Sequence, residues 1–211
     1  MNILAEKVLE NFKNDVFTDQ DVAVLFPGSN DSRYGLVKRA LKSGQIVRIR
    51  RGIYCLSKKY QRHGINLYAL SQQLYGPSFI SLESALSYHG WIPEGVFSTT
   101  CVCVKKTLSF TTPLGRFDYR HIPSIVFYES VERIEEQQEA YFMASPWKAL
   151  CDYVYVYKKA WTSIDPLVKS LRIDEQELRR ARREELLNLK QNTQSRRVHD
   201  FIDGVLKDLK L

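Results

Sequence analysis

Apolar residues recur at helical spacing near the start of the chain. Isoleucine, leucine, valine and phenylalanine stand three and four positions apart over residues 3–13, which predicts a first amphipathic helix. Thr18 with Asp21 three residues later is typical of a helix N-cap. The apolar positions that follow predict a short second helix, and Pro27-Gly28 predicts where it ends.

A third helix and a hairpin follow. Ser29-Asn30-Asp31 offers several N-cap residues for a helix that runs to about Ser43 and ends at Gly44. The β-prone segments 45–50 and 53–56 flank the turn Arg51-Gly52, which predicts two antiparallel strands. Three helices followed by a hairpin form the order of a winged helix-turn-helix, so we expect that fold over residues 1–60.

Residues 61–211 show a different pattern, in which short apolar strands alternate with helices. Ser145-Pro146 is typical of a helix start, and the last fifty residues are expected to be entirely helical. We therefore expect an α+β protein with two domains in contact: the winged helix and a mixed α/β domain that ends in helices. In the second domain helices are expected over 65–74, 82–89 and 145–158, and strands over 78–81, 99–105, 108–111, 116–122 and 125–128.

The third helix has two unlike faces when its residues are placed about 100° apart. The side expected to pack on the first two helices carries Leu36, Val37, Ala40 and Leu41. The opposite side carries Ser32, Gly35, Lys38, Arg39 and Lys42. Such a helix, apolar on one side and polar or basic on the other, suits the major groove of double-stranded DNA.

Two further residues of this helix are less clearly placed. Tyr34 lies at the boundary between the faces. Arg33 projects over the apolar side from the first turn, where it either reaches a phosphate or pairs with Asp31.

The predicted hairpin is also basic. Two-residue alternation puts Arg48 and Arg50 on one strand face, and Arg51 lies in the turn. Arginines here suit phosphates or the minor groove, although surface strands commonly carry solvated arginines.

The net charge supports an anionic partner, and its distribution along the chain indicates which domain binds that partner. The chain has a net charge of +7 and a pI near 9.2. Residues 1–60 hold eleven lysines and arginines against six acidic residues, so most of the excess lies in the predicted DNA-binding domain.

Cysteines and termini point to an ordinary intracellular protein. The four cysteines have no metal-ligand spacing, so we expect buried thiols, no metal and no cofactor. The opening residues lack a basic region followed by an apolar run, and no stretch would span a membrane well. A cytoplasmic location is expected.

Several segments resemble the AbiEi family of antitoxins and transcriptional regulators from bacterial type IV toxin–antitoxin and abortive-infection systems. The segments are Leu41–Gly44 with Ile46–Arg48 and Arg51–Tyr54, Ser81–Gly90, Thr112–Gly115 with Phe117, and Ala144–Tyr153. The resemblance spans roughly residues 5–160 and leaves the last fifty residues unmatched.

The resemblance implies binding to inverted repeats in the protein's own promoter. It also implies an antitoxic second domain that counters a nucleotidyltransferase-like toxin without a stable complex. One alternative is a stand-alone repressor whose second domain senses a ligand or mediates oligomerisation.

The remote alternative is a metal-dependent nuclease. Its nearest candidate is Asp118-Tyr119-Arg120, which has arginine where a nuclease needs lysine. His89 and His121 are isolated and expected to be structural. No enzyme activity is expected.

Two other segments have structural explanations. Five arginines between 172 and 183 lie among acidic residues, so a solvated helix with ion pairs is favoured over a second anionic contact. Trp147 and the tyrosines at 153, 155 and 157 are expected to pack in a core.

Overall fold

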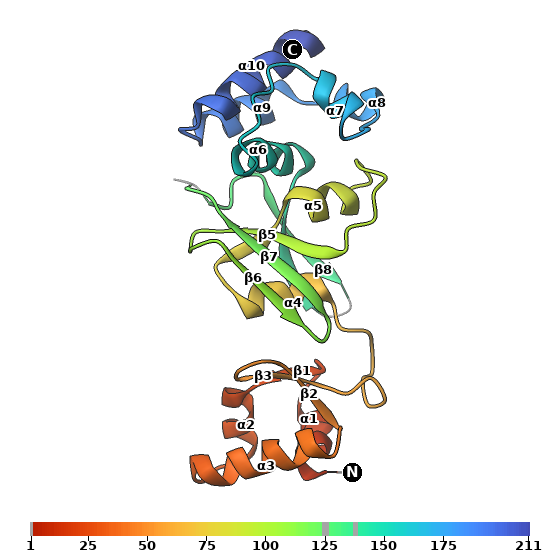
Figure 1. Ribbon diagram of the computed structural model, residues 1–211, viewed down its shortest axis with the longest axis vertical. Helices are drawn as coiled ribbons and strands as arrows, with labels where there is room; N and C mark the ends of the chain where they lie inside the picture. Colours follow the sequence, from red (N-terminus) through yellow and green to blue (C-terminus); the bar gives the residue numbers. More distant parts are fainter. Residues whose placement is uncertain (1, 124–126, 137–138) are drawn as a thin grey trace.

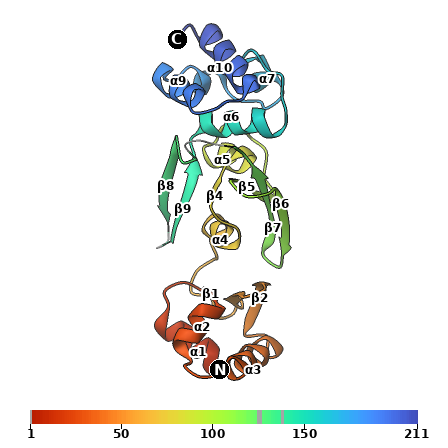
Figure 2. The same ribbon diagram turned by 90° about the vertical axis from the view of Figure 1, so that its left-hand side faces the viewer.

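The computed structural model describes residues 2–123, 127–136 and 139–211. Figures 1 and 2 show an elongated molecule with a small helical unit and its sheet at one end, a larger sheet in the middle, and the C-terminal helices at the other end. We call residues 2–60 the N-terminal unit and the rest the C-terminal unit.

The N-terminal unit has the expected helices and hairpin, with one additional strand. Its elements are α1 (Ile3–Asn11), β1 (Val16–Thr18), α2 (Asp19–Leu25), α3 (Asn30–Lys42), β2 (Ile46–Arg50) and β3 (Ile53–Leu56). The helix starts are formed by the predicted side chains. Thr18 and Asp21 form a full capping box, and the Ser29 hydroxyl accepts a hydrogen bond from the Ser32 N–H.

Strand β1 is the element that the sequence does not predict. It has only three residues and pairs with β3, giving an antiparallel sheet of order β1-β3-β2. Its partner lies more than thirty residues away in the sequence, so no local pattern marks it.

The three-stranded sheet is buried on both faces. Ile46, Tyr54 and Leu56 pack with the three helices in one apolar cluster. Ile49 and Cys55 belong instead to the core of the C-terminal unit. The hairpin therefore contributes to two cores, and its second face is covered by the larger unit.

The C-terminal unit is built on a six-stranded mixed sheet of order β6-β7-β5-β4-β9-β8. Pairs β5–β7 and β4–β9 are parallel and the other neighbours antiparallel. The strands are β4 (Ser78–Ile80), β5 (Ser98–Cys103), β6 (Leu108–Thr112), β7 (Gly115–His121), β8 (Val131–Glu136) and β9 (Glu139–Ala144).

The strand predictions are confirmed for β4 to β7 and fail beyond them. Residues 125 and 126 of the strand expected at 125–128 lie outside the described residues, while Phe127 and Tyr128 lie in a turn. Strand β8 escapes prediction because this edge strand is mostly acidic and exposed, which removes the apolar alternation that would mark it. Strand β9, which pairs with β8, is also not predicted.

Helices α4 (Leu67–Leu74) and α5 (Leu82–Tyr88) pack against the sheet, and the helices from α6 (Pro146–Val156) onward follow the last strand. α4 lies against β4, β5 and β9, α5 packs on β5, and α6 packs on α5, α9 and α10. The predicted Ser145 cap of α6 is confirmed, since its side chain accepts from the Lys148 N–H. The remaining helices are α7 (Asp165–Lys169), α8 (Glu175–Leu178), α9 (Arg183–Gln191) and α10 (Arg196–Leu209).

Helix α10 is anchored as its apolar spacing predicts. Val198, Phe201 and Val205 are buried on one side of the helix. Gly204 lies directly against the Thr162 carbonyl with no room for a Cβ, so a larger residue would push α10 away from the preceding loop.

The connection between the units is fixed by hydrogen bonds. The Asp15 carboxylate accepts from the Arg62 N–H at 2.9 Å, and the Arg62 guanidinium donates to the carbonyls of Leu9 and Lys13. The segment after β3 is thus held against the end of α1, which supports the expectation that the two units touch.

All four cysteines are free and buried, as predicted. Burial raises the pKa of the Cys101 thiol to about 12, and burial together with Asp15 raises the pKa of Cys55 to about 11. No helix in the part of the chain that the structure describes has the length and apolar character of a membrane span.

Candidate nucleic-acid interface

Helix α3 forms the outer end of the N-terminal unit in both views, at the opposite end of the molecule from α10 (Figures 1 and 2). Val37 and Ala40 are buried against the rest of the unit. Ser43 and Gly44 end the helix, and Gly44 adopts a φ of +66°, a conformation that glycine accepts without strain. The outer face of α3 is therefore open to a partner.

The residues predicted on that face lie on it. Ser32, Tyr34, Lys38, Arg39 and Lys42 are all exposed, and Tyr34 shows 64% of its surface. Gly35 lies among them, with Arg39 Nη1 3.4 Å from the place a Cβ would occupy. The missing side chain leaves space for Arg39 and for the close approach of another molecule's backbone.

The cations of this face have no acidic partner. Within the described residues, no carboxylate lies within 4 Å of the charged groups of Lys38, Arg39 or Lys42. Three neighbouring unpaired cations on one helix face repel one another in the free protein, and an anion placed there would relieve that repulsion.

Arg33 forms hydrogen bonds within the N-terminal unit. Its guanidinium donates to the Gly28 carbonyl at 2.7 Å and also reaches Asn30 and the Phe26 carbonyl. In the described chain it does not pair with Asp31. Arg33 instead holds the turn between α2 and α3, and so fixes the angle at which α3 is presented.

The wing arginines do not project together, contrary to the prediction. The register of β2 against β3 shifts between Arg48 and Arg50, which breaks the two-residue alternation on which the prediction depends. Arg48 lies over the Tyr54 ring, with its Cζ 5.9 Å from the ring centroid. Burial and the nearby carboxylate of Asp19 raise the pKa of Tyr54, while Arg48 opposes this rise.

Arg50 is turned toward the C-terminal unit. Its Nη1 donates to the Leu74 carbonyl at 2.6 Å, and its Cζ lies 4.2 Å from the centroid of the Phe110 ring. The side chain stays accessible to solvent, but these two contacts use it to join the hairpin to α4 and β6. No local pattern in the sequence indicates this role, because both partners lie more than twenty residues away.

Arg51 also remains open to a partner. It is exposed in the tight turn beside Gly52, whose φ is +78°. The Gly52 carbonyl accepts from the Asp19 N–H at 3.0 Å, which ties the turn to the start of α2. Arg51 therefore stands at a fixed position on the N-terminal unit.

Comparison with known proteins gives one family match, which lies within this unit. Residues 6–57 match the model of a family described as "Transcriptional regulator, AbiEi antitoxin". Over these residues the N-terminal unit is similar to the AbiEi antitoxin family. The resemblance seen in the sequence is confirmed over these residues.

The AbiEi match covers α1 to β3 and therefore every residue placed in the candidate interface. Three of the four sequence segments that carry the resemblance lie beyond it. No curated protein matches the chain.

The residues that a nuclease would need are engaged otherwise. Burial opposes ionisation of Asp118, yet hydrogen bonds from Arg116 and Ser109 lower its pKa, and the Arg116 Nε lies 3.0 Å from its carboxylate. Across residues 2–123, 127–136 and 139–211 no three histidine, cysteine or acidic side chains gather as metal ligands would. His89 bonds the Ala144 carbonyl and His121 the Lys105 carbonyl, both structural contacts.

Three of the five C-terminal arginines form ion pairs, as the solvated-helix interpretation predicts, although the helix in this segment, α8, has only four residues. Arg179 pairs with Glu175 and Arg180 with Glu177, in each case across one helical turn. Arg172 pairs with Glu94. The aromatic residues of α6 also pack as expected: Trp147 is buried against Trp91, and Tyr153 stacks on Trp161.

Proposed function

We propose that the N-terminal unit is a winged helix-turn-helix that binds double-stranded DNA, with α3 in the major groove and β2–β3 as the wing. The single observation that carries this proposal is the outer face of α3, where Lys38, Arg39 and Lys42 are exposed and unpaired among the residues that the structure describes. The match of residues 6–57 to a family described as a transcriptional regulator supports it.

The proposed contacts differ from the predicted set in two positions. Ser32, Tyr34, Lys38, Arg39 and Lys42 face the groove, and Arg48 and Arg51 approach the backbone. Arg33 and Arg50 are left out because each is used within the protein. They position α3 and the hairpin without touching DNA.

We further propose that the protein represses its own promoter through inverted repeats and is the antitoxin of a type IV system. Its counterpart would be a nucleotidyltransferase-like toxin that it counters without a stable complex. Residues 1–60 form the DNA-binding domain and residues 61–211 the antitoxic or regulatory domain. Four free thiols suit a reducing cytoplasm, where we place the protein.

The DNA-binding proposal is tested by fluorescence anisotropy with labelled duplexes from the protein's own upstream region and a scrambled duplex. We expect preference for the upstream duplex and a steep decrease in affinity with added salt, because phosphate contacts release counterions. Equal binding to both duplexes at every salt concentration would contradict sequence-specific repression.

The antitoxin proposal needs a separate experiment. The adjacent open reading frame is sequenced, and a nucleotidyltransferase-like product is expressed with and without this protein. Restored growth without co-purification supports the type IV scheme. If no such gene adjoins, or growth is not restored, the stand-alone repressor is favoured.

A further inference from the structure

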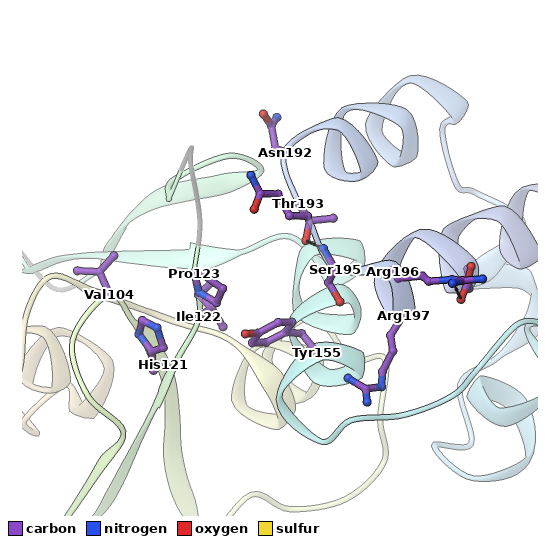
Figure 3. Close-up of a pocket in the computed structure, with 12 residues that line it drawn as sticks. Val104, His121, Ile122, Pro123, Tyr155, Asn192, Thr193, Ser195, Arg196 and Arg197 are labelled. Carbon is purple, nitrogen blue, oxygen red and sulfur yellow. Dashed lines mark hydrogen bonds and ion pairs between the residues drawn. The ribbon is translucent and has the colours of Figure 1, made fainter.

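A cavity lies in the C-terminal unit between the end of β7, helix α6 and the start of α10 (Figure 3). Its volume is about 840 Å³, within the range of about 300–1,000 Å³ typical of small-molecule sites. The proposed DNA interface lies at the other end of the molecule (Figure 1), so a duplex bound to α3 leaves the cavity free.

The walls of the cavity combine an apolar side with a polar one. Ile122 and Pro123 come from the end of β7, and the Tyr155 ring projects from α6 toward them (Figure 3). The segment that leads into α10 supplies the polar groups of Asn192, Thr193 and Ser195. A planar or apolar group fits the first side, and a group with several hydrogen-bond acceptors fits the second.

The charge at the polar side is positive. Arg196 turns toward Asp200, its Nε 4.0 Å from a carboxylate oxygen, whereas Arg197 has no acidic partner among the residues placed by the structure. In the described chain Ser195 caps α10 without a side-chain hydrogen bond, so the first-turn N–H groups are not satisfied by a cap side chain. An exposed unpaired arginine beside the positive end of a fourteen-residue helix favours an anion.

The cavity adjoins a second hollow that is lined by charged residues. A smaller hollow of about 40 Å³ shares Ile122, Tyr155 and Thr193 with it and reaches Lys148 and Asp152. These two side chains are more than nine-tenths buried and form an ion pair, and the Ser81 hydroxyl donates to Asp152 at 2.7 Å. The Lys148–Asp152 pair carries no net charge, whereas Glu129 also lines this hollow and adds a negative charge there, so the preference for an anion arises at the α10 side.

We propose that this cavity binds a phosphomonoester of mononucleotide size. Its phosphate lies at Arg197 and the start of α10, and its planar part lies against Ile122, Pro123 and Tyr155. The phosphate supplies the negative charge that Arg197 lacks, and the planar group covers the apolar wall. This site is independent of the proposed DNA contacts.

The test is isothermal titration calorimetry on the full chain with the four ribonucleoside 5′-monophosphates, ribose 5-phosphate, inorganic phosphate and adenosine. We expect one site per chain, a Kd below about 1 mM for at least one monophosphate, and binding at least about tenfold weaker for adenosine. Weak binding of inorganic phosphate at the same site would agree with the proposal, because phosphate supplies the charge without the planar group.

Variants locate the site. Arg197→Gln is expected to weaken monophosphate binding by about ten- to a hundredfold, because it removes a charge-assisted hydrogen bond. Tyr155→Leu removes the ring and is expected to weaken the monophosphate more than ribose 5-phosphate. Arg180→Gln is the matched control, since Arg180 is an exposed arginine of the same unit outside the cavity.

Three results would overturn the proposal. One is the absence of heat with every monophosphate at millimolar concentration, and another is an equal effect of Arg197→Gln and Arg180→Gln. The third is Arg197-dependent binding of a short single-stranded oligonucleotide with no binding of monophosphates, which would assign the cavity to a polymer. Circular dichroism of each variant confirms that it is folded, and affinity for the upstream duplex is measured separately.

Discussion

Two segments of the chain are rich in arginine and lysine, and they use those charges in opposite ways. On α3, Lys38, Arg39 and Lys42 are exposed without an acidic partner among the described residues. Between residues 172 and 183, three of the five arginines pair with carboxylates. Density of positive charge is similar in both places, so it does not identify a nucleic-acid surface. What distinguishes them is whether each cation is already neutralised within the protein.

The buried charges form a third class. Lys148 and Asp152 are bonded to each other and to Ser81, and they are hidden from any macromolecular partner. Their expected role is to hold α6 in place. Substitutions in each class separate the three roles, and their expected effects differ widely in size.

The strongest effect is expected from removing all three cations of α3. Lys38→Ala with Arg39→Ala and Lys42→Ala should abolish preference for the upstream duplex and reduce the salt slope of binding by about 0.9 for each phosphate that is no longer neutralised. The matched control is Arg172→Ala with Arg179→Ala and Arg180→Ala. Anisotropy titrations across a salt series measure both variants; similar decreases in affinity would show that overall charge alone drives binding.

Breaking the buried ion pair should destabilise the fold strongly. Asp152→Asn leaves Lys148 buried without a counter-charge, and we expect the free energy of unfolding to fall by about 3–5 kcal/mol. Urea denaturation followed by tryptophan fluorescence measures it. A variant with Lys148→Met, Asp152→Leu and Ser81→Ala should recover most of that decrease. A decrease below about 1 kcal/mol for Asp152→Asn would mean that the pair is solvated.

A single groove-facing substitution should change specificity as well as affinity. Arg39→Ala is expected to weaken binding to the upstream duplex by about 1–3 kcal/mol and to relax preference at one base position. Competition with duplexes substituted at each position of the repeat measures this change. If binding is weakened equally at all positions, Arg39 contacts the DNA backbone and not the bases.

The two wing arginines Arg50 and Arg51 provide a paired test of which side of the hairpin faces DNA. Arg51→Ala should weaken all duplexes alike and lower the salt slope by about 1, if it neutralises one phosphate. Arg50→Ala should leave the salt slope unchanged and instead reduce stability by about 1 kcal/mol, because the hydrogen bond to the Leu74 carbonyl is removed. Unchanged binding in both Arg51→Ala and Arg39→Ala would contradict the proposed orientation on DNA.

The weakest effect is expected at a paired surface arginine. Arg180→Ala removes a partly exposed ion pair with Glu177, and such pairs contribute only about 0–1 kcal/mol. Stability and duplex affinity should both stay within experimental error. A measurable decrease in duplex affinity would instead support a second anionic contact on the C-terminal unit.

Features that depend on neighbours a few residues apart can be predicted from the amino-acid sequence alone. Thr18, Ser29 and Ser145 cap helices because each side chain reaches an N–H three residues later. The same local spacing locates the two faces of α3, where Val37 is buried and Lys38 and Arg39 are exposed. The similarity of residues 6–57 to the AbiEi family is likewise recognisable from the residues.

Features that depend on distant contacts are visible only in the folded chain. The hairpin packs on two cores, a bulge separates Arg48 from Arg50, and Arg50 reaches Leu74 and Phe110 from another part of the chain. The cavity beside Tyr155 exists because α10 packs on α6 near the end of β7. Sequence periodicity reports which side of an element is buried, but not which distant element covers it, and here that difference separates a free cation from an occupied one.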